Sequence, residues 1–269
     1  DLGKGSAMQA ILFDLDGVIY QGDRPIEGAA DVIAWIRGEA IPHLFLTNTS
    51  SRPRSELCRK LGRMGIAIDP EQILSPPVAA ARWLHAQSAG PVALFVPPAT
   101  QAEFAGLPRW NGDSHQAVGA VVIGDLAEAW TFARLNQAFQ LLMASPAPRL
   151  VALGMTRYWR TSAGLQLDAG PFVSALQYAA GIEPVVTGKP ARGFFLAAAE
   201  TLGMPPDQLL MVGDDIRGDV QGAQKAGLRA ALVRTGKFQP QDLESGVQPD
   251  VVLDSVASLP AWWRANAEQ

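Results

Sequence analysis

The sequence predicts an α/β fold, in which a Rossmann-like parallel-sheet core carries an inserted, smaller α/β domain. Short apolar runs typical of buried strands alternate along the chain with segments whose apolar residues recur at helical spacing, and this alternation predicts parallel sheets covered by helices. Polar residues follow several of the strand-like runs. They would lie at the carboxyl ends of the strands, where open α/β sheets bind ligands.

The composition is that of a globular protein, with 48% hydrophobic and 18% charged residues. The 22 basic and 26 acidic residues give a net charge of −4, which argues against a nucleic-acid-binding surface or a polybasic membrane anchor. No apolar run approaches the length of a membrane span. Cys58 is the only cysteine, so an intrachain disulfide is excluded and a reducing compartment fits. We expect a cytoplasmic protein without a nucleic-acid or membrane partner.

Residues 8–77 are expected to form the first part of the core, after a tail of residues 1–7 that we exclude from the fold. The pattern predicts a first strand in the run Ala10–Val18, a helix through Ala29–Ile36, a strand at His43–Leu46 and a helix from Leu57 to Gly65.

Residues 78–184 are expected to form the inserted domain, which has an α/β pattern of its own. Its predicted elements are strands at Val92–Val96, Val118–Ile123 and Leu150–Leu153, helices through Phe132–Leu142 and Phe172–Gly181, and a hairpin of Tyr158–Arg160 with Leu165–Leu167.

Residues 185–269 return to the core. Strands are predicted at Val185–Val186, Leu209–Val212, Ala230–Val233 and Val251–Leu253, with helices through Phe194–Leu202 and Ile216–Gly227 and a terminal helix that packs Trp262–Trp263 on the sheet.

Two aspartates, Asp14 and Asp16, follow the first strand-like run. Residues two apart on a strand point to the same face, so their carboxylates would repel one another. Such an arrangement is usually tolerated where a cation or a shared proton relieves the repulsion. Alone, Asp-Leu-Asp-Gly is equally typical of a strand-to-turn junction.

Later strand ends supply further polar groups: Thr47, Asn48, Lys189, Asp214, Asp215 and Asp219. Acids, a hydroxyl and a lysine at one sheet edge predict a site for a hard cation and a phosphoryl group, and Mg²⁺ prefers such oxygen ligands. Each residue also has a structural alternative. Lys189 alone is typical of a surface loop, and acids such as Asp215 and Asp219 favour a helix start.

The inserted domain leaves two questions open. Gly124–Asp125 repeats the Gly-Asp pattern after a strand-like run, but without a second acid nearby, and we interpret it as a turn. Amphipathic side chains on and near the predicted hairpin, namely Met155, Arg157, Tyr158 and Trp159, are candidates for substrate contact or equally for the core and rim of this domain.

Four segments resemble, in order, the motifs of the haloacid dehalogenase-like superfamily: Asp14–Val18, Thr47, Lys189, and Gly213–Asp215 with Asp219. The resemblance covers nearly the whole chain from Met8, and the insertion resembles a type II cap. Short segments such as Thr47–Thr49, Arg157–Trp159 and Val233–Lys237 are most similar to the branch that contains phospholysine phosphohistidine inorganic pyrophosphate phosphatase.

This resemblance implies a Mg²⁺-dependent phosphatase that works through an aspartyl-phosphate. Asp14 would be the nucleophile, and Asp16 would protonate the leaving group and then activate water. The metal would bind the Asp14 and Asp214 carboxylates and the Asp16 backbone carbonyl. An acid at the second aspartate position fits a phosphatase better than a dehalogenase.

Further roles follow from the same resemblance. Thr47 and Asn48 would bind phosphoryl oxygens, Lys189 would hold the transferring group, and Asp215 and Asp219 would orient metal-bound water. The substrate would be a small phosphoramidate, pyrophosphate or phosphate monoester. A phosphomutase and a non-catalytic phospho-ligand-binding protein remain alternatives, and a homodimer through the cap is a further expectation.

Overall fold

The computed structural model describes residues 6–268, and the chain divides into two units. The first unit comprises the described residues up to Thr47, Arg54–Leu74 and the chain from Lys189 onward, and the second comprises Asn48–Pro53 and Ser75–Gly188. Both units contain a parallel sheet with helices on its faces, which confirms the predicted α/β class.

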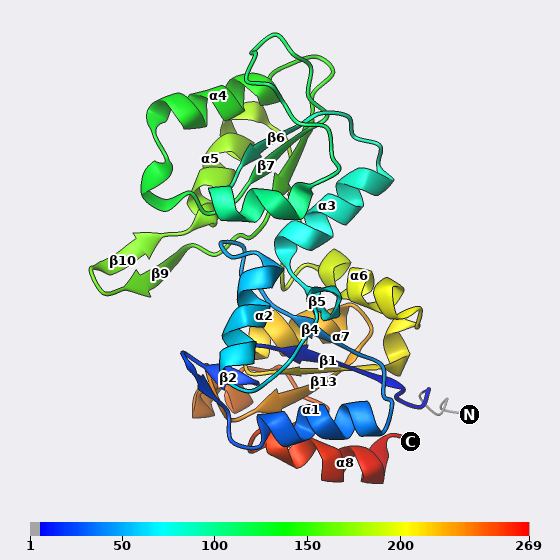
Figure 1. Cartoon of the computed structure of the whole chain (residues 1–269). Coiled ribbons are helices and arrows are strands. Elements are labelled where there is room, and N and C mark those ends of the chain that lie inside the picture. The colour runs from blue at the N-terminus through cyan, green and yellow to red at the C-terminus, as the bar shows by residue number, and fades with distance from the viewer. Residues whose placement is uncertain (1–5, 269) are drawn as a thin grey trace. The chain divides into compact units, whose positions relative to one another are not determined.

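A six-stranded parallel sheet forms the centre of the first unit, in the order β14-β13-β12-β1-β4-β5 (Figure 1). Its strands are β1 (Ala10–Asp14), β4 (His43–Leu46), β5 (Ile73–Leu74), β12 (Leu209–Gly213), β13 (Arg229–Val233) and β14 (Val251–Leu253). β1 is buried along its length, as its apolar sequence requires.

Helices cover both faces of this sheet (Figure 1). Apolar side chains of α1 (Ala29–Gly38), α2 (Arg54–Arg63) and α8 (Leu259–Asn266) pack with Ile11, Phe13 and Phe45 on one face. On the other side lie α6 (Arg192–Leu202) and the short α7 (Gly222–Lys225). A two-stranded hairpin of β2 (Tyr20–Gln21) and β3 (Arg24–Pro25) follows β1.

The order in which strands are added to the sheet reverses at β1, and this topology determines where the polar residues at the strand ends lie. The chain proceeds from β1 to β4 and β5 on one side and later adds β12, β13 and β14 on the other. Such a switch point opens a crevice at the carboxyl ends of the strands. Asp14 ends β1 opposite Leu46 of β4, while Asp214 directly follows β12.

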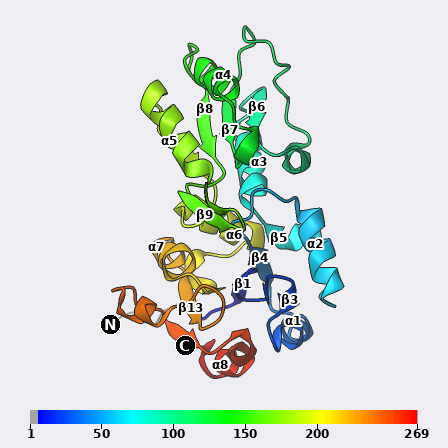
Figure 2. The ribbon, with the colours of Figure 1, turned by 90° about the vertical axis from the view of Figure 1, so that its left-hand side faces the viewer.

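The second unit has a four-stranded parallel sheet in the order β11-β8-β7-β6. Its elements are α3 (Pro76–Ala86), β6 (Val92–Phe95), β7 (Ala120–Ile123), α4 (Phe132–Leu142), β8 (Arg149–Ala152), β9 (Tyr158–Thr161), β10 (Gly164–Leu167), α5 (Ala169–Ala180) and β11 (Val185–Val186). α4 and α5 pack on one face and α3 on the other, as the view of Figure 2 shows for α5 and α3. β9 and β10 form the predicted hairpin.

Three local expectations differ from the structure. The main segment of the second unit begins at Ser75 and not at residue 78, and Pro76 and Pro77 form the first turn of α3, a place that proline fits. Val185 and Val186 pair with β8, so this segment joins the sheet of the second unit and not the core. Ser6, placed in the excluded tail, donates a hydrogen bond to Asp207 Oδ2 at 2.6 Å; the rest of that tail through residue 5 lies outside the described residues.

Among residues 6–268, no helix is long and apolar enough to cross a membrane.

Candidate active site

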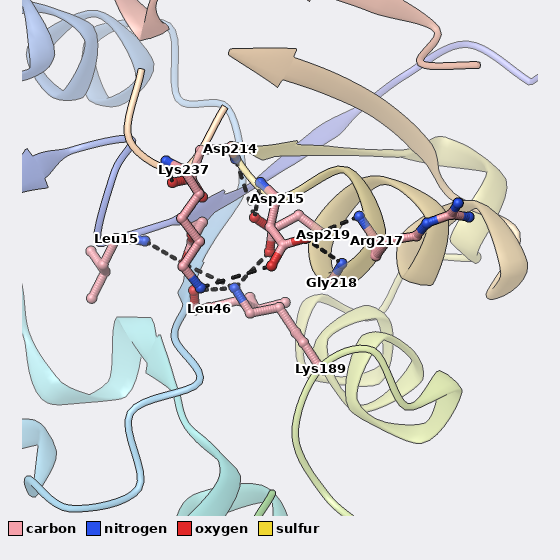
Figure 3. Close-up of polar contacts among 10 residues, drawn as sticks. Leu15, Leu46, Lys189, Asp214, Asp215, Arg217, Gly218, Asp219 and Lys237 are labelled. Carbon is pink, nitrogen blue, oxygen red and sulfur yellow. Dashed lines mark hydrogen bonds and ion pairs between the residues drawn. The ribbon is translucent and has the colours of Figure 1, made fainter. Parts of the chain in front are cut away.

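Three carboxylates meet at the switch point of the first unit. Asp14, Asp214 and Asp219 each offer an oxygen, and these oxygens all lie within 4.8 Å of one another. The three side chains are buried, with 8%, 1% and 1% of the residue exposed. Figure 3 shows Asp214 and Asp219 close together after β12, with the Lys189 side chain extending to Asp219 from the segment before α6. Buried carboxylates are normally paired or bound to a cation, so this cluster requires compensation.

A π-helix brings Asp219 to the cluster. The sequence pattern predicted one helix through Ile216–Gly227, but Ile216–Gln221 forms a π-helix and α7 follows it. Asp215 caps its start, since Oδ1 accepts from the backbone N–H groups of Arg217 at 3.0 Å and Gly218 at 2.8 Å. The wider turn points Asp219 back toward the strand end. Such π-turns are frequent at functional sites.

The Asp219 carboxylate then holds the backbone after β12. Its Oδ2 accepts from the N–H groups of Asp214 and Asp215, both at 3.2 Å. Gly213 leaves room for this contact, because a Cβ at that position would lie 2.2 Å from the Asp219 Cβ. The Gly-Asp-Asp sequence is therefore a packing requirement as well as a source of acids.

Lys189 is the buried cation of the cluster. Its Nζ donates to Asp14 Oδ1 at 2.8 Å and to Asp219 Oδ1 at 2.7 Å, and lies 3.5 Å from the Leu46 carbonyl oxygen. Burial alone would lower the pKa of Lys189, but attraction to Asp14 and Asp219 outweighs it and raises the pKa above its usual value. The ammonium group therefore stays charged. The burial of Lys189 and its contacts with Asp14 and Asp219 exclude the surface-loop alternative.

One ammonium group does not balance three carboxylates. Burial raises the pKa of Asp14, Asp214 and Asp219 to about 6 each, and repulsion from a neighbouring aspartate adds to this in every case. Lys189 opposes the rise for Asp14 and Asp219, and a hydrogen bond from the Lys237 backbone opposes it for Asp214. The site retains negative charge that a further cation would neutralise.

Asp214 provides the direct test of whether a metal fits. Its Oδ2 accepts from the Lys237 backbone N–H at 2.7 Å, whereas its Oδ1 is buried and accepts no hydrogen bond. A buried carboxylate oxygen without a donor costs free energy unless a cation or a shared proton reaches it. Together with the oxygen-only ligand set, this fits a hard divalent cation.

The remaining predicted residues of the strand ends have different surroundings. Thr47 is buried, directly follows β4, and donates its N–H to the Leu74 carbonyl at 3.1 Å. Asp16 is exposed in the turn after β1, and Asp215 pairs with Lys237 Nζ at 3.8 Å besides capping the π-helix. Asn48 is exposed and belongs to the second unit.

The candidate substrate contacts of the insertion separate into two kinds. Met155 packs against the apolar cluster beneath α4 and α5, as expected of a core residue. Arg157, Tyr158 and Trp159 are exposed at the hairpin, and the Arg157 guanidinium lies 5.8 Å from the Tyr158 ring centre. Their contact with a substrate stays a prediction.

Sequence reasoning assigned no role to Thr235–Lys237, which the structure places against Asp214 and the turn after β1. Besides the Lys237 N–H, the Thr235 hydroxyl donates to the Gly17 carbonyl at 2.5 Å. Two signals were available: the similarity of Val233–Lys237 to one branch of the family, and the position of this segment just after a predicted strand, at the same sheet edge as the acids.

Two family models and several named relatives match the chain. A family model described as haloacid dehalogenase-like hydrolase matches residues 11–107, and one described as HAD-hydrolase-like matches residues 186–259. Phospholysine phosphohistidine inorganic pyrophosphate phosphatase of Homo sapiens is 37% identical over 257 residues, covering 94% of this chain and 93% of that protein. Haloacid dehalogenase-like hydrolase domain-containing protein 2 of Bos taurus is 36% identical, covering 90% of each chain.

Solved structures show the same fold. A hypothetical protein from Pyrococcus horikoshii OT3 matches with a TM-score of 0.86 and 28% identity, covering 95% of this chain and 99% of that one. A 4-nitrophenylphosphatase from Thermotoga maritima matches with a TM-score of 0.84 and 25% identity, covering 94% of this chain and 97% of that one.

Proposed function

Because the chain belongs to the haloacid dehalogenase-like hydrolase family, we propose that it is a Mg²⁺-dependent phosphatase acting through an aspartyl-phosphate on Asp14. The observation that carries this proposal is the cluster of three buried carboxylates around one buried lysine, with a carboxylate oxygen of Asp214 left without a donor. The names of the relatives as phosphatases support the same reaction class.

The metal would be held by Asp14, Asp214 and the backbone carbonyl of Asp16. When bound, Mg²⁺ neutralises negative charge, so that an anionic phosphoryl group can approach an anionic carboxylate. Asp219 is already engaged with Lys189 and with two backbone N–H groups, which suits it to orienting the site from behind the metal ligands.

The chain's own residues would carry the reaction in two steps. A carboxylate oxygen of Asp14 attacks phosphorus, the bond from phosphorus to the leaving group breaks, and Asp16 gives that group a proton. A water molecule then attacks the phosphorus of the aspartyl-phosphate, the bond from phosphorus to the Asp14 oxygen breaks, Asp16 takes a proton from that water, and inorganic phosphate leaves. The exposure of Asp16 suits a residue that exchanges protons with solvent and substrate. Thr47, Asn48 and Lys189 would bind the phosphoryl oxygens.

The substrate would be a small phosphorylated compound. The relatives' names support phosphoramidates and inorganic pyrophosphate in one case and an aryl phosphate monoester in another. Arg157, Tyr158 and Trp159 would contribute to the choice of leaving group. A cytoplasmic location and a homodimer through the second unit belong to the same proposal, and light scattering of the purified protein tests the homodimer.

Phosphate release tests this proposal. Phosphoramidates, pyrophosphate, 4-nitrophenyl phosphate and sugar phosphates are assayed with Mg²⁺ or with EDTA, using wild type, Asp14→Asn and the control Asp125→Asn. Asp125 also follows a buried strand after a glycine, but its Oδ1 only accepts from the Ala127 N–H. We expect Mg²⁺-dependent release that Asp14→Asn abolishes and Asp125→Asn retains. Full turnover by Asp14→Asn would refute the nucleophile, and isomerised sugar phosphate without free phosphate would indicate a mutase.

A further inference from the structure

The segment Thr235–Lys237, one residue beyond β13, contacts both Asp214 and the turn after β1, the two parts of the proposed metal site. We propose that this segment positions the metal site. Thr235 is a positioning residue that keeps the Asp16–Gly17 turn at the place relative to Asp214 that Mg²⁺ binding requires. The inference rests on the proposed function, because it presumes that a metal binds here. It adds residues outside the four motifs that indicated the site.

The first contact selects one oxygen of Asp214. The Lys237 backbone N–H donates to Oδ2 at 2.7 Å. Gly17 and Gly236 approach the same oxygen so closely that an added Cβ would lie 1.9 Å and 2.1 Å from it. Oδ2 is therefore enclosed by backbone on several sides, and Oδ1 is the oxygen without a donor. The segment thus determines which oxygen remains for a metal.

The second contact fixes the turn after β1. The Thr235 hydroxyl donates to the Gly17 carbonyl at 2.5 Å, and the Gly17 N–H donates to the Tyr20 carbonyl at 2.6 Å. The Gly17 N–H and the Asp16 carbonyl belong to one planar peptide unit, so holding one orients the other. Bonds on both sides of Gly17 therefore restrict the Asp16 carbonyl, which is the proposed backbone ligand.

Thr235 is the side chain through which this coupling is best tested. The Lys237 side chain is 76% exposed and its Nζ lies 3.8 Å from Asp215 Oδ2, so that ion pair contributes little. The Lys237 contact with Asp214 is made by the backbone and survives most substitutions. The Thr235 hydroxyl, in contrast, can be removed with little change of shape by Thr235→Val and kept by Thr235→Ser.

The experiment measures Mg²⁺ affinity by isothermal titration calorimetry on metal-free protein, alongside Mg²⁺-dependent phosphate release. The variants are Thr235→Val, Thr235→Ser and the control Thr201→Val, which removes an exposed hydroxyl bonded to a backbone carbonyl within α6. We expect Thr235→Val to bind Mg²⁺ roughly 10- to 100-fold more weakly, as is typical when a group that orients metal ligands is lost. Thr235→Ser and Thr201→Val should bind like wild type.

Thermal unfolding without metal separates positioning from loss of the fold. Thr235→Val should unfold cooperatively in EDTA, and Mg²⁺ should raise its unfolding temperature less than it raises that of wild type. Thr235→Ser should show the same rise as wild type. Wild-type turnover combined with unchanged Mg²⁺ affinity in Thr235→Val would refute the positioning role and leave the proposed function intact. Absence of both Mg²⁺ binding and phosphate release in wild type would instead refute the proposed function, and the inference with it.

Discussion

A methyl group added at Gly236 would displace the carboxylate of Asp214, and Gly22 offers a matched comparison. The two glycines have nearly the same left-handed backbone, with φ of +62° and +61°. A Cβ at Gly236 would lie 2.1 Å from Asp214 Oδ2 and 2.5 Å from the Gly17 Cα, whereas a Cβ at Gly22 would meet nothing within 4 Å. Gly236→Ala and Gly22→Ala therefore share the backbone strain and differ in the contact with the site.

The magnitudes follow from these distances. Left-handed backbone costs a residue with a Cβ about 1–2 kcal/mol, so both variants should lose at least that much unfolding free energy. Gly236→Ala should lose more than Gly22→Ala, because its Cβ also meets the Gly17 backbone. Carbon and oxygen atoms normally approach to about 3.3 Å, so the Asp214 carboxylate must move by roughly 1 Å in Gly236→Ala. Misplacement of that size at a reacting site can cost about 100-fold in rate. We expect Gly236→Ala to lose about 100-fold in kcat and Gly22→Ala to keep the wild-type rate.

The assay is phosphate release at saturating substrate and Mg²⁺, paired with urea denaturation of each variant. Denaturation verifies that the shared stability loss is present in both proteins. A Gly236→Ala enzyme that is as active as Gly22→Ala would refute the reasoning, because the Asp214 carboxylate would then not depend on close packing by this segment.

Two further predictions concern the charges of the cluster. Lys189→Met should cost about 3–5 kcal/mol of unfolding free energy at pH 7.5 in EDTA, because it leaves buried carboxylates unpaired. The control Lys225→Met, at an exposed lysine, should cost far less. A loss below about 1 kcal/mol for Lys189→Met in urea denaturation would contradict this prediction. The three clustered carboxyls have a pKa of about 6 in the folded chain, against 3.8 for an ordinary aspartate. Between these pH values the folded state therefore binds more protons than the unfolded state. The free energy of unfolding without metal should fall as pH rises from about 4 to 6. Urea denaturation across that pH range should show a weaker fall of the unfolding free energy in Asp214→Asn and in wild type with Mg²⁺. If wild type and Asp214→Asn in EDTA had the same slope of unfolding free energy against pH, the repulsion among the three carboxylates would be refuted.

Much of the fold could be predicted because the deciding interactions are local or strongly periodic. The strand His43–Leu46 and the helix ending at Gly181 lie where their apolar spacing and glycine stop indicate. β5, at Ile73–Leu74, is too short to show a period and exists because it pairs with β4. The assignment of Val185–Val186 failed for the same reason, since only pairing with β8 decides which sheet these residues join.

The candidate site could be predicted as far as its strand ends. Asp14 and Asp214 lie beside each other because neighbouring parallel strands end at the same edge. The path of the chain within 216–221 could not be predicted, because the π-helix depends on Asp215 capping and on the contact of Asp219 with Lys189. The role of Thr235 depends on a hydrogen bond between residues 218 positions apart, for which a single sequence has no local signal.

The position of β1 in the middle of its sheet has a consequence for the order in which the protein is made. β1 precedes every other strand of residues 6–268, yet one of its two neighbours, β12, begins at Leu209. As synthesis proceeds from the N-terminus, the whole second unit emerges from the ribosome while one edge of this apolar strand has no native partner. Open edges of apolar strands invite pairing with other chains. The nascent chain must therefore keep this edge of β1 from aggregating until β12 has been synthesised, and the Asp14–Lys189 contact cannot form before Lys189 emerges.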